Sequence, residues 1–149
     1  MTLTDSIRIK ASSEKIFNFL TSLKDTESYK AWHPDHILMR WIKGEPFTEG
    51  SVAYSEEYLH GKIHKAKFIC TKVVPNRMIE YRPPFPLSII FPGSQFIIEP
   101  VGEGSCVFTA TVKARMGPLS RRLSRRQLEG VKIHMKEEGK NLKAIVEKQ

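Results

Sequence analysis

Hydrophobic and polar residues alternate in the first segment of the chain, Thr2–Ile9, with the two-residue period of a half-buried β-strand. Two segments with helical spacing follow, at residues 12–23 and 25–32. Ser12 or Ser13 can cap the first of them, and the second ends before a proline, because the residue before a proline disfavours helix. The pattern therefore predicts one strand and then two short helices.

Six strand-like segments occupy the middle of the chain, and Gly, Pro or Asn, which favour turns, separate most of them. They span residues 38–44, 51–60, 62–74, 77–83, 94–101 and 105–115. Short connections between consecutive strands predict an antiparallel meander. Gly117–Pro118 ends the last strand, and the chain from there to Lys148 has helical character. This order predicts a single α+β domain over residues 1–149, a curved antiparallel sheet wrapped around one long C-terminal helix.

The last predicted helix carries an apolar stripe at spacings of three and four residues, as helices do when they bury one face. Its members are Leu128, Val131, Met135, Leu142, Ile145 and Val146. Glu138 falls near the middle of this stripe, and His134 lies at its edge, one turn earlier. Because a desolvated carboxylate is costly unless a cation or hydrogen bonds offset it, Glu138 requires a partner.

Three arrangements are compatible with this position of Glu138. His134 and Glu138 are four residues apart, so their side chains share one face of a helix and can bind a single metal ion. Alternatively, Glu138 pairs with a buried Lys or Arg from the sheet, or the helix is rotated so that both residues are peripheral. The metal interpretation needs further ligands.

Alternation in the hairpin around Gly61 supplies a second inward carboxylate. Lys65 and Lys67 point outward, which assigns His64 and the other even-numbered residues of that strand to the interior. If the turn has an even length, the odd-numbered residues of the preceding strand, Glu57 among them, share that face. The inward position of Glu57 depends on this turn length.

The segment YKAWHPDH, residues 29–36, contains two of the five histidines of the chain, which flank a Pro-Asp pair. Proline restricts the backbone, which suits a loop that presents a ligand, and either His33 or His36 is then that ligand. His36, Glu57, His134 and Glu138 would then supply two nitrogen and two oxygen ligands. Such a set is compatible with Zn²⁺ and also with Fe²⁺ or Mn²⁺.

Composition places the chain among globular proteins, with 40% hydrophobic and 27% charged residues in a length of 149. No stretch is long and apolar enough to span a bilayer, and the N-terminus lacks the pattern of a secretory signal. Cys70 and Cys106 have no metal-type spacing and predict two buried thiols. We therefore expect a cytoplasmic protein.

The net charge of +8 raises the question of a polyanionic partner. Part of the excess is concentrated at Arg121, Arg122, Arg125 and Arg126. No aromatic residues interleave with these arginines to stack on bases, so we expect a solvated basic face and no nucleic-acid partner. A role of the arginines at an RNA or membrane surface is the alternative.

The chain as a whole resembles the START-like or Bet v 1-like helix-grip superfamily, also described as polyketide cyclase-like. The resemblance lies in SIRIKASSEKIFNFL at the start, the GSVAYSEEYLHGK hairpin, VVPNRMIEYRP and the long final helix. It implies the helix-grip fold with a small hydrophobic or aromatic molecule as its partner. The superfamily contains lipid carriers, cyclases and hydrolases, so the fold does not specify the chemistry.

A narrower resemblance links YKAWHPDH, the inward Glu57 and HMKEEGKNLK on the last helix to the diacetylphloroglucinol hydrolase and phloretin hydrolase family. That family cleaves a carbon–carbon bond between an acyl group and a phenolic ring, using a metal held by two histidines and two glutamates. The resemblance assigns these roles, with Zn²⁺ as the expected ion, to His36, Glu57, His134 and Glu138. It also places Tyr29 near the substrate, and the inward His64 is the candidate for a further substrate-contacting histidine.

The sequence thus predicts a metal-dependent hydrolase of an acylated aromatic or polyketide-like compound, in which Tyr29 or His64 relays a proton to the ring carbon. His33 would orient the neighbouring ligand. Aromatic residues that could line the pocket, although core packing is the simpler role for each, are Trp32, Trp41, Phe68 and Phe96. The alternative is a non-catalytic carrier of a hydrophobic ligand, in which the polar cluster only orients that ligand.

Overall fold

The computed structural model describes residues 1–149 and contains a sheet of seven antiparallel strands. The strands are β1 (Thr2–Ile9), β2 (His36–Lys43), β3 (Val52–Leu59), β4 (Lys62–Val74), β5 (Met78–Arg82), β6 (Ser94–Pro100) and β7 (Cys106–Lys113). Their order in the sheet is β1-β7-β6-β5-β4-β3-β2. Consecutive strands from β2 to β7 are therefore neighbours, which confirms the predicted meander, and β1 pairs with β7 at the other edge.

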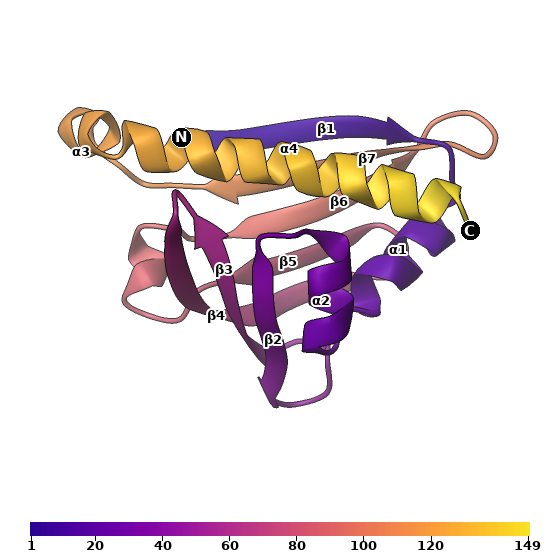
Figure 1. Ribbon diagram of the computed structural model, residues 1–149, viewed down its shortest axis with the longest axis horizontal. Coiled ribbons are helices and arrows are strands. Elements are labelled where there is room, and N and C mark those ends of the chain that lie inside the picture. The colour runs from indigo at the N-terminus through magenta and orange to yellow at the C-terminus, as the bar shows by residue number, and fades with distance from the viewer.

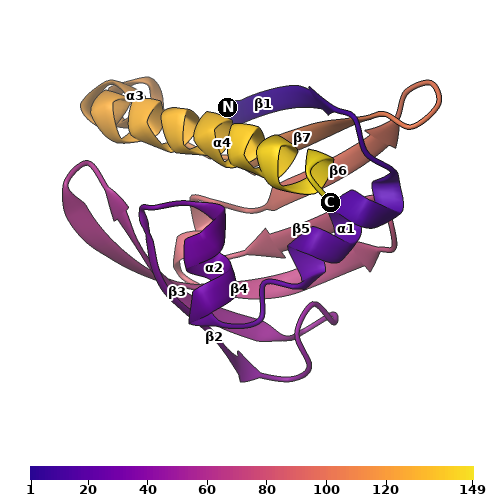
Figure 2. The ribbon, with the colours of Figure 1, turned by 45° about the vertical axis from the view of Figure 1, so that its right-hand side comes forward.

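The sheet curves around one long helix, as predicted for a helix-grip α+β fold. Helices α1 (Ser13–Thr21) and α2 (Thr26–Trp32) connect β1 to β2, and α4 (Arg125–Glu147) lies along β1 (Figure 1). In Figure 2, β2 and β3 lie on one side of α4, and β1 and β7 lie on the other. None of the helices combines the length and apolarity that a membrane crossing requires.

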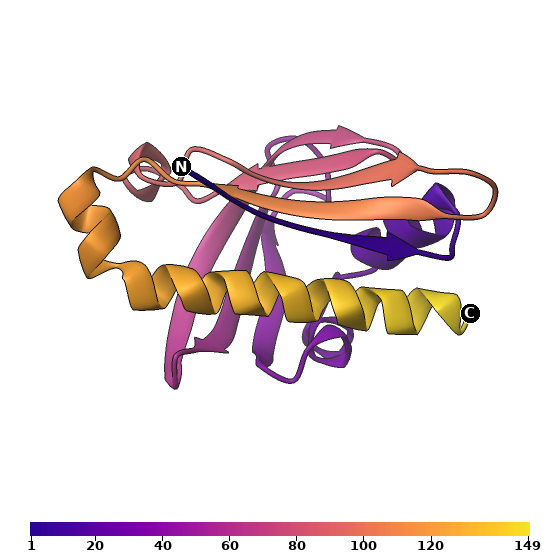
Figure 3. The same ribbon diagram turned by 90° about the horizontal axis from the view of Figure 1, so that it is seen from above.

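The C-terminal segment differs from the single helix that we predicted. A short helix, α3 (Pro118–Leu123), precedes α4, and the chain changes direction between them (Figure 3). Ser124 leaves the helical conformation at φ −96° and ψ 9°, yet its N–H still bonds to the Ser120 carbonyl and its own carbonyl accepts from Leu128 N–H. These bonds keep the backbone satisfied across the break, and neither proline nor glycine marks it in the sequence. A 3₁₀ helix, η1 (Leu87–Ile89), was also not predicted.

The buried face of α4 is the predicted stripe with two additions. Leu128, Met135, Leu142 and Val146 are buried, and His134 and Gly139 are buried with them. A Cβ at Gly139 would lie 3.4 Å from Ile7 Cγ2, so glycine allows close approach of α4 to β1. The two stripe residues that are only half-buried are Val131 and Ile145. Both cysteines are buried free thiols, as predicted.

Leu142 is fully buried in the core, whereas Ile133 of the same helix is 60% exposed. Leu142→Ala removes buried methyl groups and leaves a cavity, so we expect the free energy of unfolding to fall by about 2–5 kcal/mol. Ile133→Ala is the matched control and should change that energy by less than about 0.5 kcal/mol. Urea unfolding followed by circular dichroism measures both, and equal losses would contradict this packing of α4.

Candidate functional site

Helix α2 and the turn after it place the first site residue. Asp25 caps the start of α2 through a capping box. At the other end, His33 has extended backbone before Pro34, so the helix stops at Trp32. The Pro-Asp turn leads directly into β2, whose first residue is His36. We had predicted that His36 lies in a loop; in the structure it is instead the first residue of a strand.

The hairpin between β3 and β4 has the even-length turn on which the position of Glu57 depended. His60 and Gly61 form a two-residue turn with φ of 56° and 71°, the positive values of a type I′ hairpin. Glu57 pairs with His64 across the two strands, so the two residues share one face. Both line the central cavity, but Glu57 is half-buried whereas His64 is exposed to solvent.

Two hydrogen bonds fasten α2 to α4 beside the site. Trp32 Nε1–H donates to the Glu138 carbonyl at 3.0 Å, and Asn141 Nδ2–H donates to the Trp32 carbonyl at 3.0 Å. Because β2 begins only a few residues after Trp32, these bonds hold its first residue next to the turn of α4 that carries His134 and Glu138.

The four residues expected to bind metal converge in the structure. His36 Nε2 lies 3.0 Å from Glu138 Oε2 and 3.2 Å from His134 Nε2. Glu57 Oε2 lies 3.2 Å from His134 Nε2 and 3.7 Å from His36 Nε2. Glu138 Oε2 is also 3.4 Å from His134 Nε2, and its only ion-pair partners are the two histidines. A buried Lys or Arg as the partner of Glu138 is therefore ruled out.

A hydrogen bond fixes where His36 carries its proton. Its Nδ1 lies 2.8 Å from the carbonyl oxygen of Tyr29, which can only accept, so Nδ1–H is the donor. In the neutral ring, Nε2 then presents a lone pair to the Glu138 carboxylate at 3.0 Å. Two acceptors this close repel each other unless a proton or a metal ion lies between them. The Tyr29 ring stacks on His36 at 3.8 Å between centroids and holds it in this orientation.

Burial and charge act in opposite directions on His134 and Glu138. Burial disfavours the His134 imidazolium, but hydrogen bonds and negative charge from Glu138 and Glu57 outweigh it and raise the pKa of His134 to about 10. Burial also disfavours the Glu138 carboxylate, but hydrogen bonds from His134 and His36 lower the pKa of Glu138 to about 2. In the absence of metal, the cluster therefore holds a proton on His134 at neutral pH.

The donor set fits a divalent ion of the size of Zn²⁺. Nitrogen and oxygen ligands about 2.0–2.1 Å from a tetrahedral Zn²⁺ lie about 3.3 Å from one another. Five donor–donor distances in the cluster fall between 3.0 and 3.7 Å. His36, Glu57 and His134 place one ligand atom each within 4.8 Å of one another, a set of two nitrogens and one carboxylate oxygen that could hold such an ion, and Glu138 lies against both histidines as a fourth candidate.

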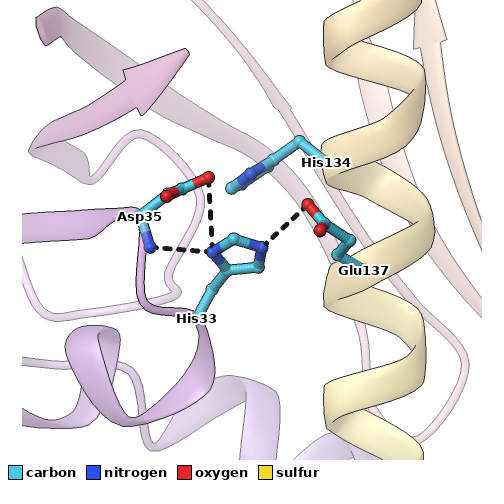
Figure 4. A group of neighbouring side chains, drawn as sticks. All are labelled: His33, Asp35, His134 and Glu137. Atoms are coloured by element: carbon cyan, nitrogen blue, oxygen red, sulfur yellow. Dashed lines mark hydrogen bonds and ion pairs between the residues drawn. The ribbon is translucent and has the colours of Figure 1, made fainter. Parts of the chain in front are cut away.

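A second group of possible ligands adjoins the first through His134 (Figure 4), and it adds His33, Asp35 and Glu137. The Asp35 backbone N–H donates to His33 Nδ1 at 2.9 Å, so this nitrogen accepts and Nε2 carries the proton. That proton is directed at Glu137 Oε1, 3.3 Å away. Both His33 nitrogens are thus engaged, and of the two candidate histidines only His36 presents a free lone pair to a cluster of ligands.

The four-residue cluster borders a cavity of about 420 Å³ with a mainly apolar lining. Glu57, His134 and Glu138 lie on its wall together with Tyr29. All four aromatic residues considered for the lining contribute to it: Trp32, Trp41, Phe68 and Phe96. Trp32 and Phe96 also pack in the core. This volume and lining suit a small aromatic or aliphatic molecule.

Two tyrosines supply hydroxyl groups to this cavity. Tyr29 O–H donates to Glu57 Oε2 at 3.2 Å, and burial together with the charges of Glu57 and Glu138 raises the pKa of Tyr29, so its phenol stays protonated. Burial and the same two carboxylates raise the pKa of Tyr81. Our sequence reasoning missed Tyr81, although its alternation with the buried Ile79 in β5 could have identified it.

Comparison with known proteins identifies the family. Residues 1–147 match the family model described as polyketide cyclase / dehydrase and lipid transport. The chain belongs to this family. No curated protein matches the chain in sequence.

Solved structures with the same fold include polyketide cyclase relatives and plant enzymes. A point mutant of norcoclaurine synthase from Thalictrum flavum, in complex with a transition-state analogue, has a TM-score of 0.77 at 12% identity, covering 99% of this chain and 94% of that chain. The Zhui aromatase/cyclase from Streptomyces sp. R1128 has a TM-score of 0.73 at 12% identity, with coverage of 99% and 94%. A protein of Thermus thermophilus has a TM-score of 0.73 at 16% identity, with coverage of 99% and 98%.

The family and these structures confirm the predicted superfamily and helix-grip fold. Family membership supports a role in binding small hydrophobic molecules or in polyketide processing. The identities are low, so the structural likeness shows the fold alone. The narrower likeness to the hydrolases stays a prediction.

His134 in metal-free protein should titrate at about pH 10 instead of near its ordinary value of 6.5. Its protonation then stabilises the fold fully below about pH 6.5, and this stabilisation is lost as the pH rises through 10. Glu138→Gln removes one of the two carboxylates that raise the pKa of His134, so the titration should move towards 6.5. Nitrogen-15 NMR of the imidazole side chains after chelator treatment measures both, and ordinary titration of His134 beside an ionised Glu138 would contradict the geometry.

Proposed function

We propose that the protein binds a small hydrophobic or aromatic molecule in its cavity and holds a divalent metal ion, with Zn²⁺ as the leading candidate, beside that molecule. The ligands of the ion would be His36, Glu57, His134 and Glu138. The observation that carries the metal proposal is the 3.0 Å distance between His36 Nε2 and Glu138 Oε2, two groups that both accept when the His36 ring is neutral. The apolar cavity and the family membership support the bound molecule.

The reaction that this site would support is hydrolysis of an acyl group attached to a phenolic ring, which the hydrolase resemblance implies. Bound at the cluster, a divalent ion polarises a carbonyl group and lowers the pKa of water. Hydrolysis places the hydroxyl of water on the acyl carbon and a proton on the ring carbon. Tyr29 is protonated, lies on the cavity wall and is oriented by Glu57, so it can deliver that proton. His64 faces the same cavity from its solvent-exposed side and is the second candidate for this step.

A carrier of a hydrophobic ligand is the second candidate function, and one feature of the cluster favours it. Four protein ligands fill a tetrahedral coordination shell, as in structural zinc sites, whereas catalytic sites keep a position open. The family also includes lipid transport in its description. In a carrier, the ion would hold α4, β2 and β3 together around the cavity and would orient a polar group of the ligand.

Protein purified without chelator should contain close to one equivalent of divalent metal, measured by inductively coupled plasma mass spectrometry. Glu138→Gln and His36→Ala should each lower the affinity at least about 10-fold. Glu137→Gln is the matched control, because it changes the neighbouring carboxylate, whose ion pair is with His33 and not with one of the four proposed ligands, and it should retain the metal. Titration of Zn²⁺ into metal-free protein at pH 7 should also release a proton from His134. Equal metal content in the Glu137 and Glu138 variants would contradict the proposed ligands.

The two functions are separated by turnover of an acylated phenol. With metal bound, wild-type protein should release acetate from diacetylphloroglucinol, and Tyr29→Phe should lower kcat by about 10²–10⁴-fold with unchanged metal content. Liquid chromatography of the products measures this loss. Tight binding of the phenol without product would exclude the hydrolase and support the carrier, and full activity of Tyr29→Phe would remove Tyr29 from the mechanism.

A further inference from the structure

Two segments at one end of the molecule expose large apolar side chains to solvent. In the loop around η1, Phe85 is 77% exposed, and in α3 Leu119 and Leu123 are 70% and 74% exposed. The η1 loop exposes three further apolar residues, Leu87, Ile89 and Ile90. Scattered surface leucines are ordinary, but a concentration of this kind marks a surface that contacts an apolar partner.

The backbone holds these two segments at the same end of the fold. Arg115 N–H, in the connection from β7 to α3, donates to the Ile90 carbonyl at 2.7 Å. Figures 1 and 3 both show α3 and the salmon-coloured turn that contains η1 at the end of the molecule opposite the C-terminus. We call residues 83–93 and 117–126 together the apolar end.

Basic residues outnumber acidic ones around the apolar end. No Asp or Glu occurs between Glu103 and Glu129, whereas this stretch contains six Lys and Arg residues. Between Glu80 and Glu99 there is likewise no acidic residue. The four arginines of the basic cluster are exposed, and the only ion pair among them joins Arg125 to Glu129. Leu119 and Leu123 therefore lie in a stretch with four exposed arginines, of which only Arg125 has an acidic partner.

In α3 the apolar and basic residues lie on different sides of one short helix. Leu119 and Leu123 are four residues apart and share a face, whereas Arg121 projects from the opposite side. Apolar side chains on one face and arginines around them are the arrangement of a helix that lies in the interface of an anionic bilayer.

The cavity extends to the apolar end. Leu87 and Phe91 of the η1 loop line it, as does Val131 from the first half of α4. Leu87 thus lines the cavity and is also 52% exposed to solvent. An apolar molecule that left the cavity past this loop would come directly into contact with a partner bound at the apolar end.

We propose that the apolar end docks on a lipid bilayer that contains anionic lipids, where Leu119, Leu123 and Phe85 enter the interface and the arginines contact the headgroups. The exposed apolar residues lie on two separate segments, both at the tip of the molecule, which suits a deformable apolar phase. The docked orientation turns the η1 loop towards the membrane, so an apolar ligand passes between bilayer and cavity without crossing water. Docking does not require the metal ion and is tested separately from the proposed function.

Co-sedimentation with vesicles tests this proposal on the full chain. Wild-type protein should bind vesicles of phosphatidylcholine mixed with phosphatidylglycerol, should not bind phosphatidylcholine alone, and should dissociate as salt is added. Arg121→Gln/Arg122→Gln should weaken binding about 30-fold, because each basic residue near an anionic surface contributes about 1 kcal/mol. Leu119→Ser/Leu123→Ser should weaken it at least about 10-fold.

Matched controls lie on other faces of the molecule. Ile42→Ser changes an exposed apolar residue near the end of β2, and Lys136→Gln/Lys140→Gln removes two exposed charges from α4; both should bind as wild type. All the changed side chains are exposed, so circular dichroism should show unaltered folding. Absence of wild-type binding to the anionic vesicles overturns the proposal. This is the result expected if the surface binds an acidic protein instead of a bilayer. Unchanged binding of the Leu119/Leu123 variant also overturns it, since adsorption would then depend on charge alone.

Discussion

A carboxylate on the buried face of α4 is the constraint on which the rest of the site depends. Glu138 replaces an apolar residue in the stripe that packs towards the sheet, and it is kept ionised by the histidines around it. His36 must direct Nε2 at this carboxylate, because its Nδ1–H bonds to the Tyr29 carbonyl. A positive charge is therefore required between the two groups, and a proton or a metal ion can supply it.

The elements that surround the cluster can be understood from this requirement. Trp32 bonds to the backbone of α4 at Glu138 and so brings the start of β2 to the helix. The type I′ turn of the β3–β4 hairpin sets the register that directs Glu57 inward. His60 in that turn bonds to the carbonyl of Gln127 and packs over Gly130, where a side chain would collide with its ring. The hairpin is thus anchored to α4 at Gln127 and Gly130, in the two turns before His134.

Most of the fold could be predicted from local patterns in the sequence. Two-residue alternation located the first strand, turn residues separated the six strand-like segments that follow it, and the three- and four-residue spacing of the last helix located its buried face. The break at Ser124 could not be predicted, because its cause is a local change in φ and ψ with no glycine or proline. Leu119 and Leu123 continue the helical periodicity in the sequence, and only the structure shows that α3 exposes them to solvent.

For the site, the sequence could predict which face of a strand or helix each side chain occupies, and this gave the inward Glu57. The choice between His33 and His36 could not be predicted, because it depends on the hydrogen bonds of each ring. His64 shows the limit of such reasoning: its face was predicted, but its exposure depends on how far β4 extends beyond the core.

The proposed metal binding and the proposed lipid docking would together give a cavity with one polar wall and with one end that faces a bilayer. The first of these is the central claim, and anomalous diffraction at the zinc absorption edge tests it most directly, on crystals of protein that has met no chelator. The account predicts one peak, about 2.0–2.2 Å from His36 Nε2, from His134 Nε2 and from an oxygen of each glutamate. Density without a peak, with His134 and Glu138 bonded directly as imidazolium and carboxylate, would contradict it.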